Sequence, residues 1–152
     1  MTEPMTERRV SRDIVVDAPP SAVFDVLADP REHGRFDGSG TVRDAVAGPD
    51  RLSLGDRFGM SMRLGVPYTI RNEVVEFVQD RRIAWRHLGH HRWRYELEPV
   101  GEGSTKVTET FDWSTSRIPK LLELVGFPAT NARGIEATLP RLKAFVEDRA
   151  GS

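Results

Sequence analysis

The segment Ile83–Trp113 reads IAWRHLGHHRWRYELEPVGEGSTKVTETFDW. Apolar or aromatic residues alternate in it with charged or small ones, which is the period of a β-strand with one covered face. Two short stretches break the alternation, Leu88-Gly89-His90 and Gly101-Glu102-Gly103, and both have turn composition. The segment therefore predicts three consecutive antiparallel strands.

The lengths of the two turns fix how these strands align. A three-residue loop at 88–90 keeps the aromatic residues opposite one another, whereas a two-residue loop would scatter them over both faces of the sheet. The expected pairs are His87 with His91, Trp85 with Trp93 and Ile83 with Tyr95 across the first loop, and Tyr95 with Glu109, Trp93 with Phe111 and His91 with Trp113 across the second.

These pairs bring all three Trp residues of the chain to one face of the predicted sheet. That face carries Trp85, His87, His91, Trp93, Tyr95, Glu109, Phe111 and Trp113. It is rich in rings but also has polar tips, which is more typical of the wall of a ligand chamber than of an aliphatic core. The alternative for each Trp is a packed core without a ligand.

The rest of the chain predicts an α+β order, with strands and two short helical segments followed by a long helix. Pro20 and Ser21 suit a helix start, and the Asp29-Pro30 step ends that helix. In the strand 68–78 we expect the even-numbered residues to face inward. The predicted elements are strands over 8–17, 41–47, 56–64 and 68–78, helical segments over 22–28 and 31–36, a turn at 65–67, a helical stripe of Ile118, Leu121, Leu122 and Val125, and a long helix to about Arg149 that contains Pro140.

Composition excludes several classes of protein. The 152 residues suit one domain, and a hydrophobic content of 38% is enough for a core. A net charge of −1 with interleaved basic and acidic residues argues against nucleic acid as a partner. No segment is apolar enough to span a membrane, and the absence of Cys favours a reducing compartment, the cytoplasm.

Five pieces of the chain, in this order, resemble the START-like helix-grip (SRPBCC) superfamily, in particular its polyketide cyclase/dehydrase-like members. They are IVVDAPPSAVFDVLADP, LGDRF, VVEFVQDRRIAWR, WRYELEPVGEGSTKVT and RGIEATLPRLK. The resemblance implies a single domain over residues 1–152, in which we expect residues 1–7 to be a flexible tail. It also implies a curved antiparallel sheet of about seven strands around a long C-terminal helix, with two short helices between the first and second strands.

In this superfamily a cavity between sheet and helix binds apolar or aromatic small molecules, so the inward residues become candidate ligand contacts. Flexible Met side chains suit varied ligands, and Phe36 falls where relatives place a ring at the cavity entrance. The candidates are Phe36, Phe58, Met60, Met62, Trp85, His87, Trp93, Tyr95, Glu109, Phe111, Trp113, Leu122, Asn131 and Ile135.

Glu109, Tyr95 and His87 are the candidate acid–base groups. A carboxylate on a covered face needs a partner or a raised pKa, and Glu109 is expected beside Tyr95. The alternative is a partly solvated Glu that is hydrogen-bonded to Tyr. Three neighbouring histidines, His87, His90 and His91, lack a metal-binding spacing, and no acidic residue is placed to be a third ligand. We therefore expect no metal and no cofactor.

Three functions remain open at this point. The first is binding of a hydrophobic, ring-bearing molecule such as a polyketide or lipid, by a monomer or a homodimer. The second is a cyclase or dehydratase that uses the cavity acid–base groups, so the sequence leaves open whether the chain is an enzyme. The third is a protein-interaction module that uses the mouth of the pocket.

Overall fold

A computed structural model describes residues 8–38, 42–64, 66–86, 91–116 and 118–150 of the chain. The elements are β1 (Arg9–Val16), α2 (Pro20–Leu27), the 3-10 turn η1 (Pro30–Glu32), α3 (His33–Phe36), β2 (Val42–Ala47), β3 (Arg57–Leu64), β4 (Val66–Val78), β5 (Arg82–Arg86), β6 (Arg92–Val100), β7 (Ser104–Asp112), α4 (Pro119–Leu124) and α5 (Phe127–Ala150). The expected α+β order is confirmed.

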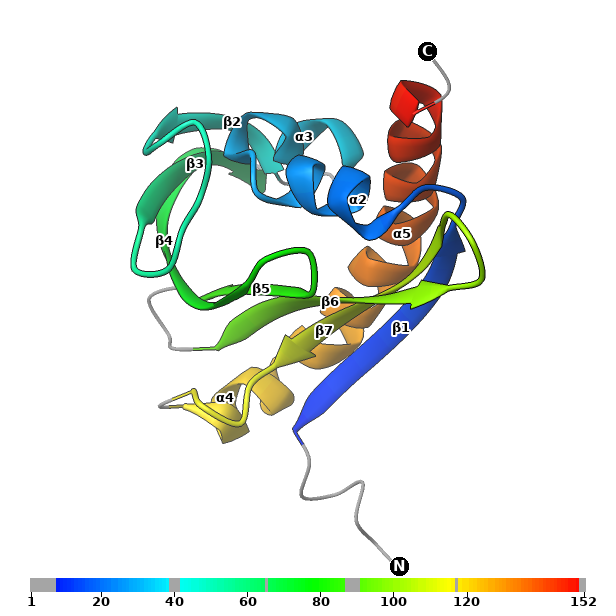
Figure 1. Ribbon diagram of the computed structural model, residues 1–152. Coiled ribbons are helices and arrows are strands. Elements are labelled where there is room, and N and C mark those ends of the chain that lie inside the picture. The colour runs from blue at the N-terminus through cyan, green and yellow to red at the C-terminus, as the bar shows by residue number, and fades with distance from the viewer. Residues whose placement is uncertain (1–7, 39–41, 65, 87–90, 117, 151–152) are drawn as a thin grey trace, which may run out of the picture.

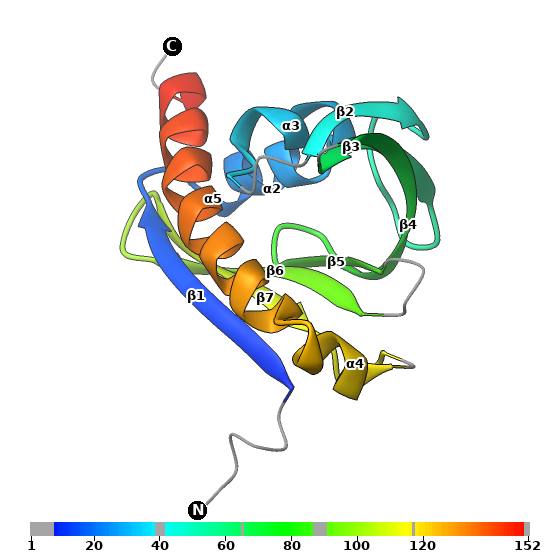
Figure 2. The same ribbon diagram turned by 180° about the vertical axis from the view of Figure 1, so that it is seen from behind.

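The seven strands form one antiparallel sheet in the order β1-β7-β6-β5-β4-β3-β2. The first strand therefore pairs with the last, and the sheet curls so that its concave side holds α5 (Figure 1). Helices α2 and α3 lie between the upper half of α5 and the β2–β3 end of the sheet, as Figures 1 and 2 both show. This is the predicted helix-grip architecture, with two short α-helices between the first and second strands.

The expected register of the central strands is also confirmed. Ile83 pairs with Tyr95 and Trp85 with Trp93 across β5 and β6. In the next pair of strands, Tyr95 lies opposite Glu109 and Trp93 opposite Phe111. The aromatic residues therefore share one sheet face, as turn length and alternation predicted. His87 itself lies outside the described residues, so its expected pairing with His91 stays a prediction.

A bulge in β4 overturns half of the predicted facing of that strand. Val74 pairs with Trp85, but the next pair is Glu76 with Ala84, so one residue of β4 is unmatched. Before the bulge the even-numbered residues face inward, and Asn72 and Val74 are buried. After it the odd-numbered Phe77 packs on Phe24 with ring centroids 5.4 Å apart, and Val78 is exposed. The inward facing predicted for Glu76 and Val78 is wrong.

The start of β4 and the burial of the segment around α4 also differ from the sequence prediction. Strand β4 begins at Val66, so Val66 and Pro67 belong to the strand and not to a turn. In the segment around α4 only Leu122 of the expected stripe is buried, and Ile118, Leu121 and Val125 are exposed. A helix of six residues is too short to bury a whole stripe against the sheet.

Helix α5 continues without interruption past Pro140, which lies on its exposed side. Proline lacks an N–H group and leaves a carbonyl of the preceding turn without its helical partner. On the exposed side of the helix that carbonyl can bind water instead. The opposite side buries Ile135, Leu139, Leu142 and Val146 in the core.

The outer face of the sheet carries an ion-pair network around Glu76. The small residue Ala84 lies in register between Glu76 and Arg94, so the long Arg side chain can reach across β5. Arg94 binds both Glu76 carboxylate oxygens at 2.8 and 3.0 Å, and its Nη2 lies 3.3 Å from Asp112. Arg92 donates to Glu76 at 2.8 Å. The Glu76 and Arg94 side chains are only 17% and 14% exposed, so this face is less solvated than the sequence suggested.

Replacing Glu76 with Gln tests this network. Hydrogen bonds from Arg94, followed by those from Arg92, hold the pKa of Glu76 below its usual 4.5. The ion pairs therefore stabilise the fold above about pH 4.5 and lose that effect as pH falls. We expect E76Q to lower the free energy of unfolding by about 1–2 kcal/mol at neutral pH. Urea denaturation measures this, and the deficit should shrink in acid. E98Q changes an exposed carboxylate and should have almost no effect; equal losses in both variants would contradict the assignment.

Candidate functional site

The inward faces of β3, β5, β6 and β7 form a wall of aromatic rings. The Trp85 ring lies 5.7 Å from the Phe58 ring and 5.8 Å from the Tyr95 ring. On the neighbouring strands, Phe111 lies 5.0 Å from Trp93. Of these residues only Trp93 is not fully buried. The cross-strand pairs that the sequence predicted therefore become direct ring contacts.

His33 closes one side of this wall, and sequence reasoning did not select it. Its imidazole stacks on Trp85 with a centroid distance of 4.8 Å and an angle of 21° between the planes. Phe36, in the same short helix α3, lies 5.7 Å from His33 and is buried. Phe36 therefore packs within the aromatic cluster. Its predicted role at a cavity entrance stays a prediction.

The His33 ring also forms a hydrogen bond with a backbone carbonyl group at the C-terminal end of α2. Its Nε2 lies 2.9 Å from the carbonyl oxygen of Leu27, the last residue of that helix, which fixes the tautomer with the proton on Nε2. Complete burial lowers the pKa of His33 from 6.5 to about 4. The imidazole is therefore neutral at physiological pH.

Replacing His33 with Phe tests this environment. A pKa lowered from 6.5 to about 4 stabilises the fold above pH 6.5, and this contribution is lost as pH falls through 4. We expect H33F to be about 1 kcal/mol less stable than the wild type near neutral pH, because the Leu27 carbonyl loses its donor. Towards pH 4 the wild type should lose about 3 kcal/mol that the variant keeps. Thermal unfolding at several pH values measures this difference. A constant gap between the two proteins would contradict the buried, neutral imidazole.

A buried acid pair lies next to the rings. The Tyr95 hydroxyl donates to Oε2 of Glu109 at 2.9 Å, which confirms the expected partner. Glu109 is only 3% exposed, so it is not the partly solvated carboxylate that was the alternative. Burial raises the pKa of Glu109 well above 4.5, and the negative charge of Asp37 raises it further, against the lowering effect of the Tyr95 hydrogen bond. Burial and the charge of Glu109 likewise raise the pKa of Tyr95.

Asp37 is held near this pair by the close approach of the next residue to α5. The backbone N–H of Gly38 donates to Oγ1 of Thr138 at 2.9 Å. A Cβ atom at position 38 would lie 2.5 Å from the backbone carbon of Ala137, so only glycine fits. The segment after α3 is therefore clamped on the long helix.

The raised pKa of Glu109 predicts how its replacement by Gln changes stability with pH. An acid whose folded pKa lies above its unfolded value stabilises the fold below about pH 4.5, and that contribution is lost as pH rises. We expect E109Q to gain stability relative to the wild type as pH rises above about 4.5, as measured by chemical denaturation. The exposed Glu102 provides the control, since E102Q should show no such trend. A difference that does not change with pH would mean that Glu109 ionises normally.

The remaining predicted contacts divide into three groups. Met60, Leu122 and Ile135 are buried in the core, in line with their predicted inward facing. Trp113 follows β7, stacks on Phe111 at 5.6 Å and donates from Nε1 to Glu123 at 2.6 Å, so its polar end already has a protein partner. His87 lies outside the described residues, and the side chain of Met62 is not among those described.

Several buried polar atoms have no hydrogen-bond partner among the described residues. They include Oε1 of Glu109, Oδ1 of Asn72 and Nδ2 of Asn131. Asn72 faces inward from β4 and Asn131 extends from the first turns of α5. Buried polar groups are nearly always paired, so unpaired ones in a native fold require an explanation such as a ligand or bound water.

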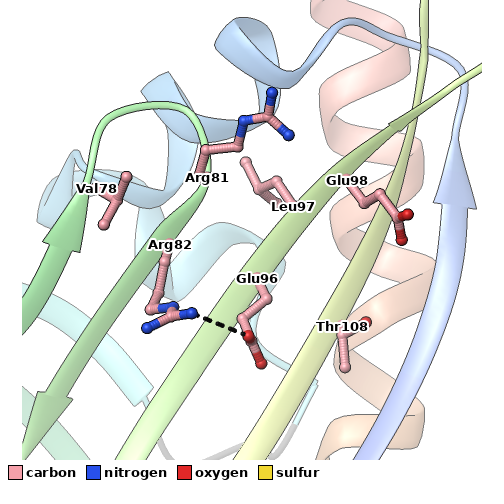
Figure 3. Close-up of a pocket in the computed structure, with 7 residues that line it drawn as sticks. All are labelled: Val78, Arg81, Arg82, Glu96, Leu97, Glu98 and Thr108. Atoms are coloured by element: carbon pink, nitrogen blue, oxygen red, sulfur yellow. Dashed lines mark ion pairs between the residues drawn. The ribbon is translucent and has the colours of Figure 1, made fainter.

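A cavity of about 370 Å³ lies elsewhere, at the outer side of the sheet (Figure 3). Arg82 and Glu96 form an ion pair across it at 3.7 Å. The seven lining residues are Val78, Arg81, Arg82, Glu96, Leu97, Glu98 and Thr108. None of them belongs to the predicted ligand contacts, so a cavity between the sheet and α5 stays a prediction.

Within the described ranges, no three His, Asp or Glu side chains come close enough together to hold a metal ion. None of the described helices is long and apolar enough to cross a lipid bilayer.

Residues 7–147 match the family described as polyketide cyclase/dehydrase and lipid transport. The chain belongs to this family, and with it to the SRPBCC helix-grip superfamily. An uncharacterized protein of Mycobacterium tuberculosis is 42% identical over 139 residues, which cover 88% of this chain and 62% of that protein. A second sequence from another strain of that organism gives the same values. The chain thus spans less than two thirds of the length of these relatives.

Solved structures with low sequence identity share the fold. A crystal structure of a protein from Nitrosomonas europaea has a TM-score of 0.73 at 17% identity and covers 96% of this chain and 98% of its own. The solution structure of an AHSA1-like protein from Aeromonas hydrophila has a TM-score of 0.64 at 18% identity, with coverages of 93% and 94%. At these identities the likeness concerns the fold alone.

Proposed function

We propose that this protein binds a hydrophobic, ring-bearing small molecule, of polyketide or lipid type, between the concave side of the sheet and α5. The observation that carries the proposal is the combination of a ring wall with buried polar atoms that have no partner in the described part of the chain. Trp85, Tyr95 and Phe111 supply flat apolar surface, while Glu109 and Asn72 offer hydrogen-bonding atoms from different strands. Ligand sites typically combine a mostly apolar lining with a few such polar groups.

Burial of apolar surface provides enough free energy for such binding. About 200 Å² of ligand surface at about 25 cal/mol per Å² gives about 5 kcal/mol before the costs of association and ordering. Because this term is nondirectional, the polar atoms would set the orientation of the ligand rather than most of its affinity.

Native mass spectrometry of protein purified without detergent tests the proposal. A bound mass in the range of a ring-bearing or lipid-like molecule, released on denaturation, is the expected result. A protein that carries no small molecule and also fails to bind ethylnaphthalene in equilibrium dialysis would contradict the proposal.

Replacing Trp85 with Leu locates the binding site. The variant removes the ring that contacts both Phe58 and Tyr95, so we expect ethylnaphthalene to bind about tenfold more weakly. Equilibrium dialysis measures the change. W93L repeats the test at a residue that is only half-buried and therefore contributes less to folding. T108A alters the outer-face cavity and should leave binding unchanged; a loss in T108A but not in W85L or W93L would place the ligand on the outer face.

The Tyr95–Glu109 pair supports a second candidate, a cyclase or dehydratase. A buried carboxyl group with a raised pKa beside a phenol is a typical acid–base arrangement, and such a group can move a proton to or from a ketide carbon or oxygen. The variants E109Q and Y95F separate the two candidates. Turnover by the wild type that the variants lose while ligand binding stays intact would support the enzyme, whereas wild-type binding without any turnover would support a binding protein.

A further inference from the structure

Glu109 has one unused hydrogen-bonding position, and it faces the protein interior. Oε2 accepts the only proton of the Tyr95 hydroxyl, so that phenol has no further proton to donate. Oε1 is buried and has no partner among the described residues. A ligand or water molecule next to Glu109 would therefore form its hydrogen bond with Oε1.

Electrostatics favour the neutral form of this carboxyl group. Glu109 is 3% exposed, and no ion pair links it to a cation within the described ranges. Asp37, on the segment clamped to α5, adds a negative charge that acts on both Glu109 and Tyr95. With Oε2 already accepting a proton, the acidic proton of a neutral Glu109 belongs on Oε1, where it can only be donated.

We infer that Glu109 acts as an un-ionised hydrogen-bond donor that selects ligands with an uncharged acceptor oxygen, such as a ketone or ether, and discriminates against carboxylates. The inference rests on the proposed binding of a ring-bearing molecule in the interior. A buried donor without an acceptor costs free energy, and a ligand oxygen removes that cost on binding. A ligand carboxylate would instead be repelled by the negative charge of Asp37, and no ion pair from the described residues would compensate for that repulsion.

The position of the pair defines where the acceptor must sit on the ligand. Tyr95 holds Glu109 at 2.9 Å, and its own ring lies 5.8 Å from that of Trp85. The acceptor oxygen therefore belongs directly on, or one bond away from, a ring that packs against Trp85 and Tyr95. An aryl ketone meets this requirement.

Three naphthalene probes substituted at the same ring position test the inference by equilibrium dialysis near neutral pH. Acetylnaphthalene has the uncharged acceptor, ethylnaphthalene has the same shape without it, and naphthoate carries the charge. We expect the ketone to bind about tenfold more tightly than the ethyl compound, and the carboxylate to bind at least about tenfold more weakly than the ketone.

Two variants of Glu109 test whether the side chain at this position donates a hydrogen bond to the ligand. E109Q can still accept from Tyr95 through its oxygen and donate through its amide, so the preference for the ketone should persist. E109L removes the donor and should bind ketone and ethyl compound equally. If E109L keeps the preference, or if E109Q loses it as fully as E109L does, a hydrogen bond donated from position 109 is not its source and the inference is wrong.

The outcomes also separate this inference from the proposed function. If none of the probes binds the wild type, the proposed function fails, and the inference fails with it. If ethylnaphthalene binds but the ketone gains nothing, the binding function stands and the selective role of Glu109 is refuted. Circular dichroism and urea denaturation of each variant show whether a lost preference comes from a lost fold.

Discussion

The register of β5, β6 and β7 is the constraint on which the chemistry of the interior depends. Side chains alternate between the two faces of a strand, so a slip of one residue would exchange the inner and outer sets. In the observed register Trp85, Tyr95 and Glu109 lie on the concave side, and Arg94 lies on the convex side. The same register therefore builds both the ring wall and the ion-pair network.

The aromatic residues were predictable because their signal is local. Alternation and the lengths of two turns are sufficient to align the three strands, and four of the expected pairs appear in the observed register. The bulge after Val74 was not predictable, because a single extra residue in a strand of 13 leaves an equally good alternation on either side. Glu76 thus changed from an expected inward residue to the centre of the outer network.

His33 and Asp37 were not predicted for a different reason. Both lie in or directly after a helix of only four residues, where no periodic pattern exists to assign a face. Their positions depend on contacts far away in the sequence, namely Trp85 for the imidazole and Thr138 for the segment after α3. The turn composition of residues 37–40 was the sequence signal at that place, and a glycine in such a loop does not reveal the helix it approaches.

Two glutamates of the sheet, the half-buried Glu76 and the buried Glu109, show how differently the two faces are built. Glu76 receives three hydrogen bonds from Arg92 and Arg94, and its pKa is lowered, so its ionisation supports folding. Glu109 receives one hydrogen bond, from Tyr95. Burial and the negative charge of Asp37 raise its pKa, so its ionisation opposes folding. An apolar residue in place of Glu109 would avoid this cost, as replacements of buried ionic groups elsewhere have shown. Polar groups that weaken a core typically belong to functional sites, and the inner carboxyl group, rather than the more highly charged outer network, is therefore the functional candidate.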